Sequence, residues 1–161
     1  ILDVSHLNEA SFWDMTELTQ GPVIASHSNA KALCDVPRNL SDEQLLKLRD
    51  LNAVIGLNAF NCFVHPQKAE QNIDNFVKHA VYIAEKIGVE HIGCGFDFFE
   101  FLPSETSSSF NEQSSPCIKG LEDCSKVPDF LKALEKAGFS KEEIECISYK
   151  NFHRVIKEIL H

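Results

Sequence analysis

The chain has 161 residues, of which 43% are hydrophobic and 24% are charged, and its formal net charge at pH 7 is −9. This length and composition fit one globular domain with a sizeable core, and the chain is too short for a complete eight-unit βα barrel. No cluster of Lys and Arg offsets the acidic balance, which argues against a surface that binds nucleic acid or an anionic membrane. No apolar run approaches the roughly 18 residues of a membrane span, so we expect no membrane-spanning segment in these residues.

The six cysteines contain no Cys-x-x-Cys pair. A chain with this much core does not need disulfides, so free thiols in a reducing cytoplasm are the expected state. Cys117 and Cys124 flank a loop, and for this pair a disulfide stays open. The chain opens on Ile1 rather than Met, in a segment that already reads as a strand, and we therefore expect the N-terminal part of a longer protein to precede it.

Short apolar runs alternate along the chain with longer segments whose apolar residues recur at the helical period. In chain order they predict a strand over 1–4, a helix over 8–19, a strand over 22–26, a helix starting at Ser41, a strand over 53–58, a helix over 68–87, a strand over 91–96 and further helices beyond Pro128. The helix signals are capping boxes at Ser41-Gln44 and Ser140-Glu143, stops at Gly88 and Gly138, and a cap for the last helix at Asn151. Ser, Glu, Pro and Asn dominate residues 103–116, so 103–127 is expected to be a long surface loop.

The alternation of strand and helix, repeated four times, predicts a parallel sheet with right-handed crossovers. Four such units make half of an eight-stranded barrel. The alternative is a small doubly wound α/β domain, but no Gly-rich phosphate loop follows any of the strands. We therefore expect a half-barrel of four βα units with additional C-terminal helices.

Three side chains with metal or proton chemistry stand at or just past the ends of predicted strands: His6, His27 and Asp97. In parallel barrels the active site lies at the carboxyl ends of the strands. Imidazole is a common zinc ligand, and a carboxylate can bind metal or move a proton. Each residue also has an ordinary explanation, a satisfied polar histidine or a helix-capping aspartate. Position alone therefore leaves a metal site and a structural role both open.

Arg38 lies in the loop after the second strand, just ahead of a helix start. It is either a surface residue or a planar clamp for a substrate carboxylate. Asn58, at the end of the third strand, either hydrogen-bonds at the same rim or has a structural role, and Glu100 can alter the acidity of the site. The remaining histidines are expected on loops or helix surfaces and are given no role: His65, His79, His91, His153 and His161.

Several segments together resemble the membrane (renal) dipeptidase family of zinc peptidases, over essentially all 161 residues. They are Asp3-Val-Ser-His6, Pro22-Val-Ile-Ala-Ser-His27-Ser28, Pro37-Arg38-Asn39-Leu40, Gly93-Cys-Gly-Phe-Asp97-Phe98, the segment from Gly120 to Asp129, and Asn151-Phe-His-Arg-Val155. The 21-residue step from His6 to His27 and the 11-residue step from His27 to Arg38 match the family's spacing.

The resemblance implies a TIM-like (β/α)8 barrel, of which residues 1–161 supply the C-terminal half, and zinc-dependent hydrolysis of dipeptides. It implies two zinc ions bridged by a carboxylate and a hydroxide, with His6 and His27 as ligands of the second zinc. Arg38 would grip the C-terminal carboxylate of the substrate. Asp97 would contact the substrate beside the first zinc and carry a proton from the attacking water to the leaving amine. The implied partners are a dipeptide and the N-terminal half of the barrel, with a homodimer left open.

The sequence departs from the family pattern in two ways. The family's His-x-Asp motif, its bridging Glu and a further substrate histidine belong to the N-terminal half and are not in this chain. Where the family continues Asp-Phe-Asp-Gly, this chain has Asp97-Phe98-Phe99-Glu100. These departures keep an alternative in view, a non-catalytic half-barrel that binds a ligand or partner. A third option is a metal-dependent hydrolase that acts on another amide.

Overall fold

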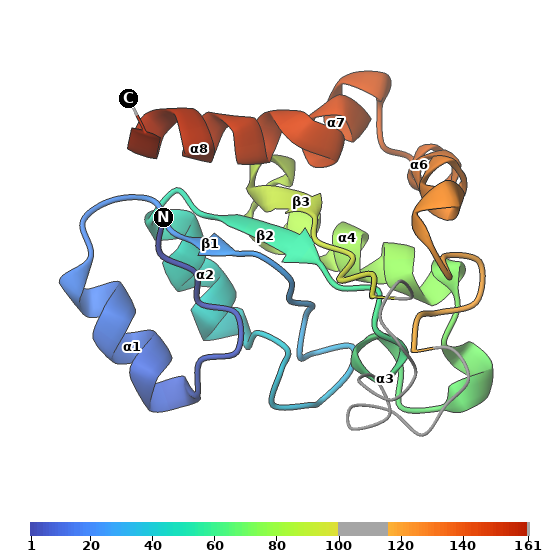
Figure 1. Cartoon of the computed structure of the whole chain (residues 1–161), viewed down its shortest axis with the longest axis horizontal. Coiled ribbons are helices and arrows are strands. Elements are labelled where there is room, and N and C mark those ends of the chain that lie inside the picture. The colour runs from blue at the N-terminus through green and yellow to red at the C-terminus, as the bar shows by residue number, and fades with distance from the viewer. Residues whose placement is uncertain (100–115, 161) are drawn as a thin grey trace.

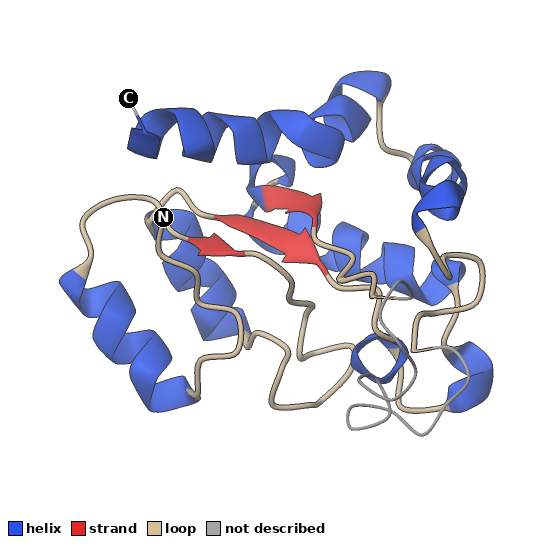
Figure 2. Ribbon diagram, in the orientation of Figure 1, coloured by secondary structure: helices blue, strands red, loops and turns tan. Residues whose placement is uncertain are grey.

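The computed structural model describes residues 1–99 and 116–160 of the chain. At its centre is a parallel sheet, which Figure 2 shows with helices around it. Its strands, in spatial order, are β1 (Ile24–Ala25), β2 (Val54–Leu57) and β3 (Ile92–Cys94). The α-helices are α1 (Glu9–Leu18), α2 (Asp42–Asp50), α3 (Asn61–Val64), α4 (Ile73–Ile87), α6 (Val127–Lys136), α7 (Lys141–Glu145) and α8 (Asn151–Leu160). Shorter turns of helix are η1 (Lys68–Glu70), η2 (Val89–His91), η3 (Cys124–Lys126) and the π-helical η4 (Cys146–Lys150).

The expected α/β fold with a parallel sheet is confirmed. The strands are shorter than the apolar runs. After β1, the amide of Ser26 donates to the carboxylate of Asp3 and the amide of His27 donates to the hydroxyl of Ser5. The segment 1–4 forms a single parallel bridge, from Asp3 to Ile24, rather than a full strand.

The helices bury their apolar faces against the sheet. Figure 1 shows α2 and α4 behind the strands, and the α7–α8 helix along the side of β3. Phe76, Ala80 and Ile83 of α4 are fully buried, together with Ile55 and Ile92 of the sheet. No helix in this described part of the chain is long and apolar enough to cross a membrane.

Both predicted capping boxes are present, and Gly88 and Gly138 have the positive φ angles of helix ends. The helix predicted over 68–87 is interrupted: η1 covers its first turn, and α4 begins anew because Asn72 caps it by accepting from the amide of Asn75. The short helix α3 was not predicted.

The loop expected over 103–127 lies partly outside the described residues. Residues 103–115 and Glu100 are not described, and α6 already starts at Val127. Cys124 is a free thiol, so it forms no disulfide with Cys117, and Cys34, Cys62, Cys94 and Cys146 are free thiols as well.

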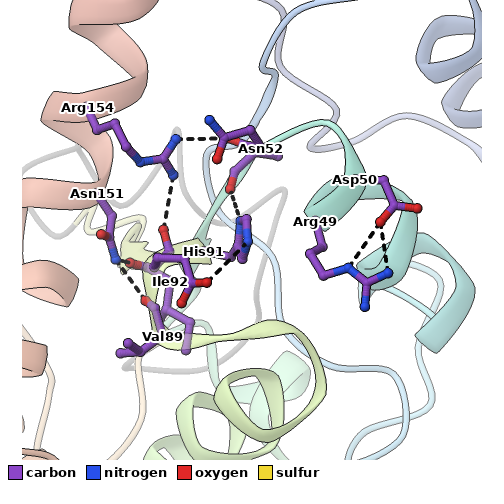
Figure 3. A network of polar contacts seen from close by, with 10 residues as sticks. Arg49, Asp50, Asn52, Val89, His91, Ile92, Asn151 and Arg154 are labelled. Carbon is purple, nitrogen blue, oxygen red and sulfur yellow. Dashed lines mark hydrogen bonds and ion pairs between the residues drawn. The ribbon is translucent and has the colours of Figure 1, made fainter.

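The prediction that Asn151 caps the last helix is wrong. The helix runs on from α7 through the π-helical turn η4 into α8, and Asn151 lies inside it. Its side-chain amide instead donates to the carbonyls of Val89 and Ile92, at 2.8 and 2.7 Å (Figure 3). Arg154, one turn on, donates to the carbonyls of Asn52 and Glu90. The C-terminal helix is thereby fastened to the start of β3.

Two histidines expected on surfaces are buried instead. His91 lies under the same helix, with Nδ1 2.8 Å from the carbonyl of Ala53 (Figure 3). His79 of α4 is fully buried; its Nδ1 accepts from the amide of Ala30, so its Nε2 carries the proton and donates to the carbonyl of Val64. Both imidazoles satisfy backbone groups in the core.

Gly95 provides a test of this packing. A Cβ on Gly95 would lie 2.0 Å from the carbonyl oxygen of Ser26, which is a clash with rigid backbone. We expect Gly95→Ala to lower the free energy of unfolding by about 3 kcal/mol or more. Gly21→Ala is the matched control, because nothing lies within 4 Å of its added Cβ. Urea unfolding of the two variants measures the difference, and equal stabilities would contradict the close approach.

His79 provides a second test, through pH. Burial lowers the pKa of His79 to about 4, whereas the unfolded chain takes up a proton near the ordinary value of 6.5. The unfolded state therefore binds more protons between these values, and stability falls as pH drops through this window, by up to about 3 kcal/mol from this group. Unfolding free energies measured from pH 7 to pH 4 should show a shallower slope in His79→Gln. His153→Gln, on the exposed face of α8, should keep the slope of the parent chain.

Candidate active site

The structure brings His6 and His27 together from positions 21 residues apart. Their Nε2 atoms are 2.8 Å apart, and the ring centroids are separated by 4.9 Å in an edge-to-face arrangement. His27 follows the end of β1, and His6 follows the bridge that pairs with β1. The two imidazoles therefore meet where the chain leaves the carboxyl end of the sheet.

A small polar scaffold fixes the histidine pair. Oδ1 of Asp3 accepts from the amides of Ser5 and Ser26, at 3.0 and 2.9 Å, and these serines directly precede the two histidines. The hydroxyl of Ser26 lies 2.7 Å from Nδ1 of His27, and the amide of His27 donates to the hydroxyl of Ser5. Because Nδ1 of His27 is occupied, its Nε2 is the atom presented to His6. Sequence reasoning missed this scaffold, although the repeated Ser-His pair was a signal for it.

The electrostatics of Asp3 agree with this role. Partial burial raises the pKa of Asp3, but the hydrogen bonds from Ser26 and Ser5 and the nearby His27 outweigh it and hold the pKa below its usual value. A carboxylate that stays ionised is the stronger acceptor for the two amides.

The backbone is strained at two of the predicted site residues. Within residues 1–99 and 116–160, the non-glycine residues with positive φ are His6 at 70°, Asn52 at 55° and Asp97 at 62°. Left-handed backbone costs an L-residue about 1–2 kcal/mol and persists where surrounding contacts enforce it. Such strain is concentrated at functional sites, which supports a functional role for His6 and Asp97.

Arg38 approaches the same place from its loop. Nη2 donates to the carbonyl of His27 across 3.5 Å, and the guanidinium carbon lies 5.5 Å from the centre of the Phe63 ring. Partial burial lowers the pKa of Arg38, and the negative charges of Asp97 and Asp3 act in the opposite direction. The guanidinium is thus a partly desolvated cation with carboxylates nearby.

Asp97 is exposed, and Oδ2 of its carboxylate accepts from the side-chain amide of Asn58 at 3.4 Å. Asn58 is fully buried and makes the rim hydrogen bond that its position allowed. It is itself fixed by Asn29, whose side chain accepts from the Asn58 amide and donates to the Asn58 carbonyl. Asn29 was not singled out from the sequence.

His6 experiences all of these charges. Its pKa is lowered first by partial burial and then by Arg38 and His27, against the opposing effects of Asp97 and Asp3. The lowered pKa favours the neutral imidazole, which is the form that binds metals. The four residues predicted from the sequence thus influence one another at one edge of the sheet.

The donors present fit part of a metal site. Among the described residues, no three His, Cys, Asp or Glu side chains form a group that could hold a metal ion. The two Nε2 atoms nevertheless converge, and they would supply two of the four ligands of a tetrahedral zinc. The hydroxyl on Nδ1 of His27 is the outer contact that orients a histidine ligand.

Imidazole, carboxylate and guanidinium groups at the carboxyl ends of parallel strands are side chains that metal-dependent hydrolases use. The whole chain, residues 1–161, matches the family model for membrane dipeptidases, peptidase family M19. The chain belongs to this family, as the sequence resemblance predicted.

Individual relatives agree with this assignment. The chain is 31% identical over 159 residues to the dipeptidase tcpJ of Claviceps purpurea, and this match covers 99% of this chain and 34% of that protein. It is 32% identical to an uncharacterized protein from the pqqA 5′ region of Klebsiella pneumoniae, over 98% of this chain and 54% of that protein. The chain thus spans between about a third and about half of these relatives.

Solved structures extend the comparison. A metallo peptidase from Rhodobacter sphaeroides, crystallised with a phosphinate mimic of the dipeptide L-Ala-D-Ala, superposes with a TM-score of 0.83 at 27% identity; the match covers 98% of this chain and 42% of that one. An amidohydrolase from Pseudomonas aeruginosa superposes with a TM-score of 0.89 at 22% identity, over 99% of this chain and 52% of that one, which shows the shared fold.

Asp3→Ala tests the scaffold. Loss of the acceptor for two backbone amides should lower the free energy of unfolding by about 1 kcal/mol at pH 7. Asp35→Ala is the control, because that carboxylate is 84% exposed and pairs with Lys31 on the surface; its effect should stay below about 0.5 kcal/mol. Because the pKa of Asp3 is lowered on folding, its contribution is present at neutral pH and fades as the carboxylate is protonated in acid. Equal denaturation curves for the two variants would contradict the scaffold.

Proposed function

We propose that the protein is a zinc-dependent dipeptidase and that this chain provides one side of its active site. The convergence of the His6 and His27 Nε2 atoms, 2.8 Å apart, is the observation that carries the proposal. Family membership and the likeness to a metallo peptidase bound to a dipeptide mimic support it.

In the proposed enzyme, residues 1–161 are the C-terminal half of a single (β/α)8 barrel domain. The parallel strand order and the match to about half of several relatives support this architecture. An N-terminal half-barrel would complete the sheet and supply the ligands of a first zinc, including a carboxylate. This chain would contribute mainly to the second zinc.

Each residue then has a defined task. His6 and His27 would hold a zinc ion through Nε2, and Ser26 and Asp3 would keep both rings in place. A bound zinc supplies Lewis-acid chemistry and a water of lowered pKa. Asp97 takes the proton of the attacking water on its carboxylate and delivers it to the leaving amine; the hydrogen bond from Asn58 leaves Oδ1 available for this transfer.

Arg38 acts on the substrate. A guanidinium pairs with a carboxylate through two parallel hydrogen bonds, and a dipeptide always offers a terminal carboxylate. Partial burial of Arg38 strengthens this pairing, because water competes less for the cation. Binding at Arg38 would place the peptide carbonyl toward the histidine pair, since Arg38 already contacts the His27 carbonyl.

The alternative function is a non-catalytic relative that binds a ligand or partner. One observation favours it, the presence of Phe99 where the family pattern has a second aspartate. Metal content and turnover separate the two proposals.

The test uses the protein together with its N-terminal half. We expect about two zinc ions per chain by elemental analysis, and hydrolysis of L-Ala-D-Ala. His27→Ala should lose zinc, whereas His153→Ala, on the exposed face of α8, should retain it. Arg38→Met should raise KM by roughly ten- to a hundredfold while the zinc content stays constant. Absence of both metal and turnover in the parent protein would instead favour the non-catalytic relative.

A further inference from the structure

Three phenylalanine rings form a row that starts at the Arg38 guanidinium. The guanidinium carbon is 5.5 Å from the centre of the Phe63 ring. Phe63 stacks on Phe60 with centroids 4.8 Å apart, and Phe60 stacks on Phe99 at 6.2 Å with an interplanar angle of 22°. All three rings are only half-buried, so part of each faces solvent. We call Phe63, Phe60 and Phe99 the phenylalanine row.

The row is separate from the hydrophobic core. Phe98, the immediate neighbour of Phe99, stacks on Phe96, and Phe96 packs against the fully buried Phe130. The members of the row lie outside that core cluster. Core packing therefore accounts for Phe96 and Phe98 and leaves the row without a structural explanation.

The row is held rigidly between the two ends of the candidate site. The Phe63 carbonyl accepts from the side-chain amide of Asn39, the residue next to Arg38, at 2.8 Å. At the other end, the Phe60 amide donates to Oδ1 of Asn58, the same side chain that donates to Asp97. The rings are thus positioned by the groups that position Arg38 and Asp97, which is what a binding subsite requires.

We propose that the phenylalanine row is a side-chain subsite and that the enzyme prefers dipeptides whose C-terminal residue is aromatic or large and apolar. This inference rests on the proposed dipeptidase function. The carboxylate and the side chain of that residue share one Cα, so a carboxylate on Arg38 brings the side chain beside Phe63. An apolar side chain there covers exposed ring faces, and an aromatic one also stacks on them.

Phe99 makes this preference particular to this chain. It stands at the second aspartate of the family's Asp-Phe-Asp-Gly pattern, so an apolar ring replaces a carboxylate at the far end of the row. A carboxylate at that position would repel the substrate's own negative charge and would offer an apolar side chain nothing to cover.

The experiment compares L-Ala-L-Phe with L-Ala-L-Ala, and L-Ala-D-Phe with L-Ala-D-Ala, on the zinc-loaded protein with its N-terminal half. We expect kcat/KM to favour the Phe dipeptide of at least one pair about tenfold. Phe99→Asp should bring the ratio close to one, mainly through KM, and Phe99→Leu should retain most of it. Tyr149→Asp makes a similar aromatic-to-acid change at a ring that is 57% exposed on η4 and should leave the ratio unaltered.

Calorimetric binding of the phosphinate mimics of Ala-Phe and Ala-Ala is the second measurement. Tighter binding of the Phe mimic that is lost in Phe99→Asp supports the subsite. If that binding is seen but neither dipeptide is hydrolysed, the subsite stands and only the proposed catalytic function fails. Equal binding of both mimics, or a preference that survives Phe99→Asp, overturns the subsite and leaves the rings as loop packing. Hydrolysis with equal kcat/KM within both pairs overturns it while the dipeptidase function stands.

Discussion

The candidate site depends on a place in the sheet that has no room for a side chain. The carbonyl oxygen of Ser26 lies so close to Gly56 and Gly95 that a Cβ on either would come within 2.1 and 2.0 Å of it. The ends of three strands can converge there only because two of the residues are glycine. Each strand end then delivers one polar residue at a short, fixed distance along the chain: His27 directly after Ser26, Asn58 two residues after Gly56, and Asp97 two residues after Gly95.

Convergence of the backbone does not by itself aim the side chains. His6 and Asp97 reach the site through left-handed backbone, which is unfavourable for both residues unless neighbouring contacts enforce it. For His6 those contacts are the Asp3 and Ser5 hydrogen bonds, which connect its turn to the residues around His27. Strain at one residue is therefore offset by hydrogen bonds from its neighbours, and the result is a pair of imidazoles held in fixed orientations.

Much of the fold could be predicted from the sequence, because its signals are local. Capping boxes at Ser41 and Ser140 and the helix stop at Gly88 depend on residues only a few positions apart. The strand ends that carry His27 and Asp97 could be located for the same reason. Asn151 was misassigned because its amide bonds to carbonyls about 60 residues away, and His79 because the amide it accepts from, that of Ala30, lies 49 residues earlier in the chain. Asp3 was missed because a carboxylate that binds two backbone amides has the same sequence signature as a surface aspartate.

Asn39 connects the loop that carries Arg38 to the phenylalanine row. Asn39 uses both of its N–H groups, donating to the carbonyls of Cys34 and Phe63, while its buried Oδ1 finds no partner among the described residues. An unpaired buried acceptor costs about 1–3 kcal/mol, so the arrangement is retained against a local penalty. The hydrogen bond from Asn39 to the Phe63 carbonyl fixes the position of Phe63, whose ring lies under the Arg38 guanidinium. The cation and the aromatic row are therefore one unit, and a loop shift that moves Phe63 would displace the Arg38 guanidinium together with the ring.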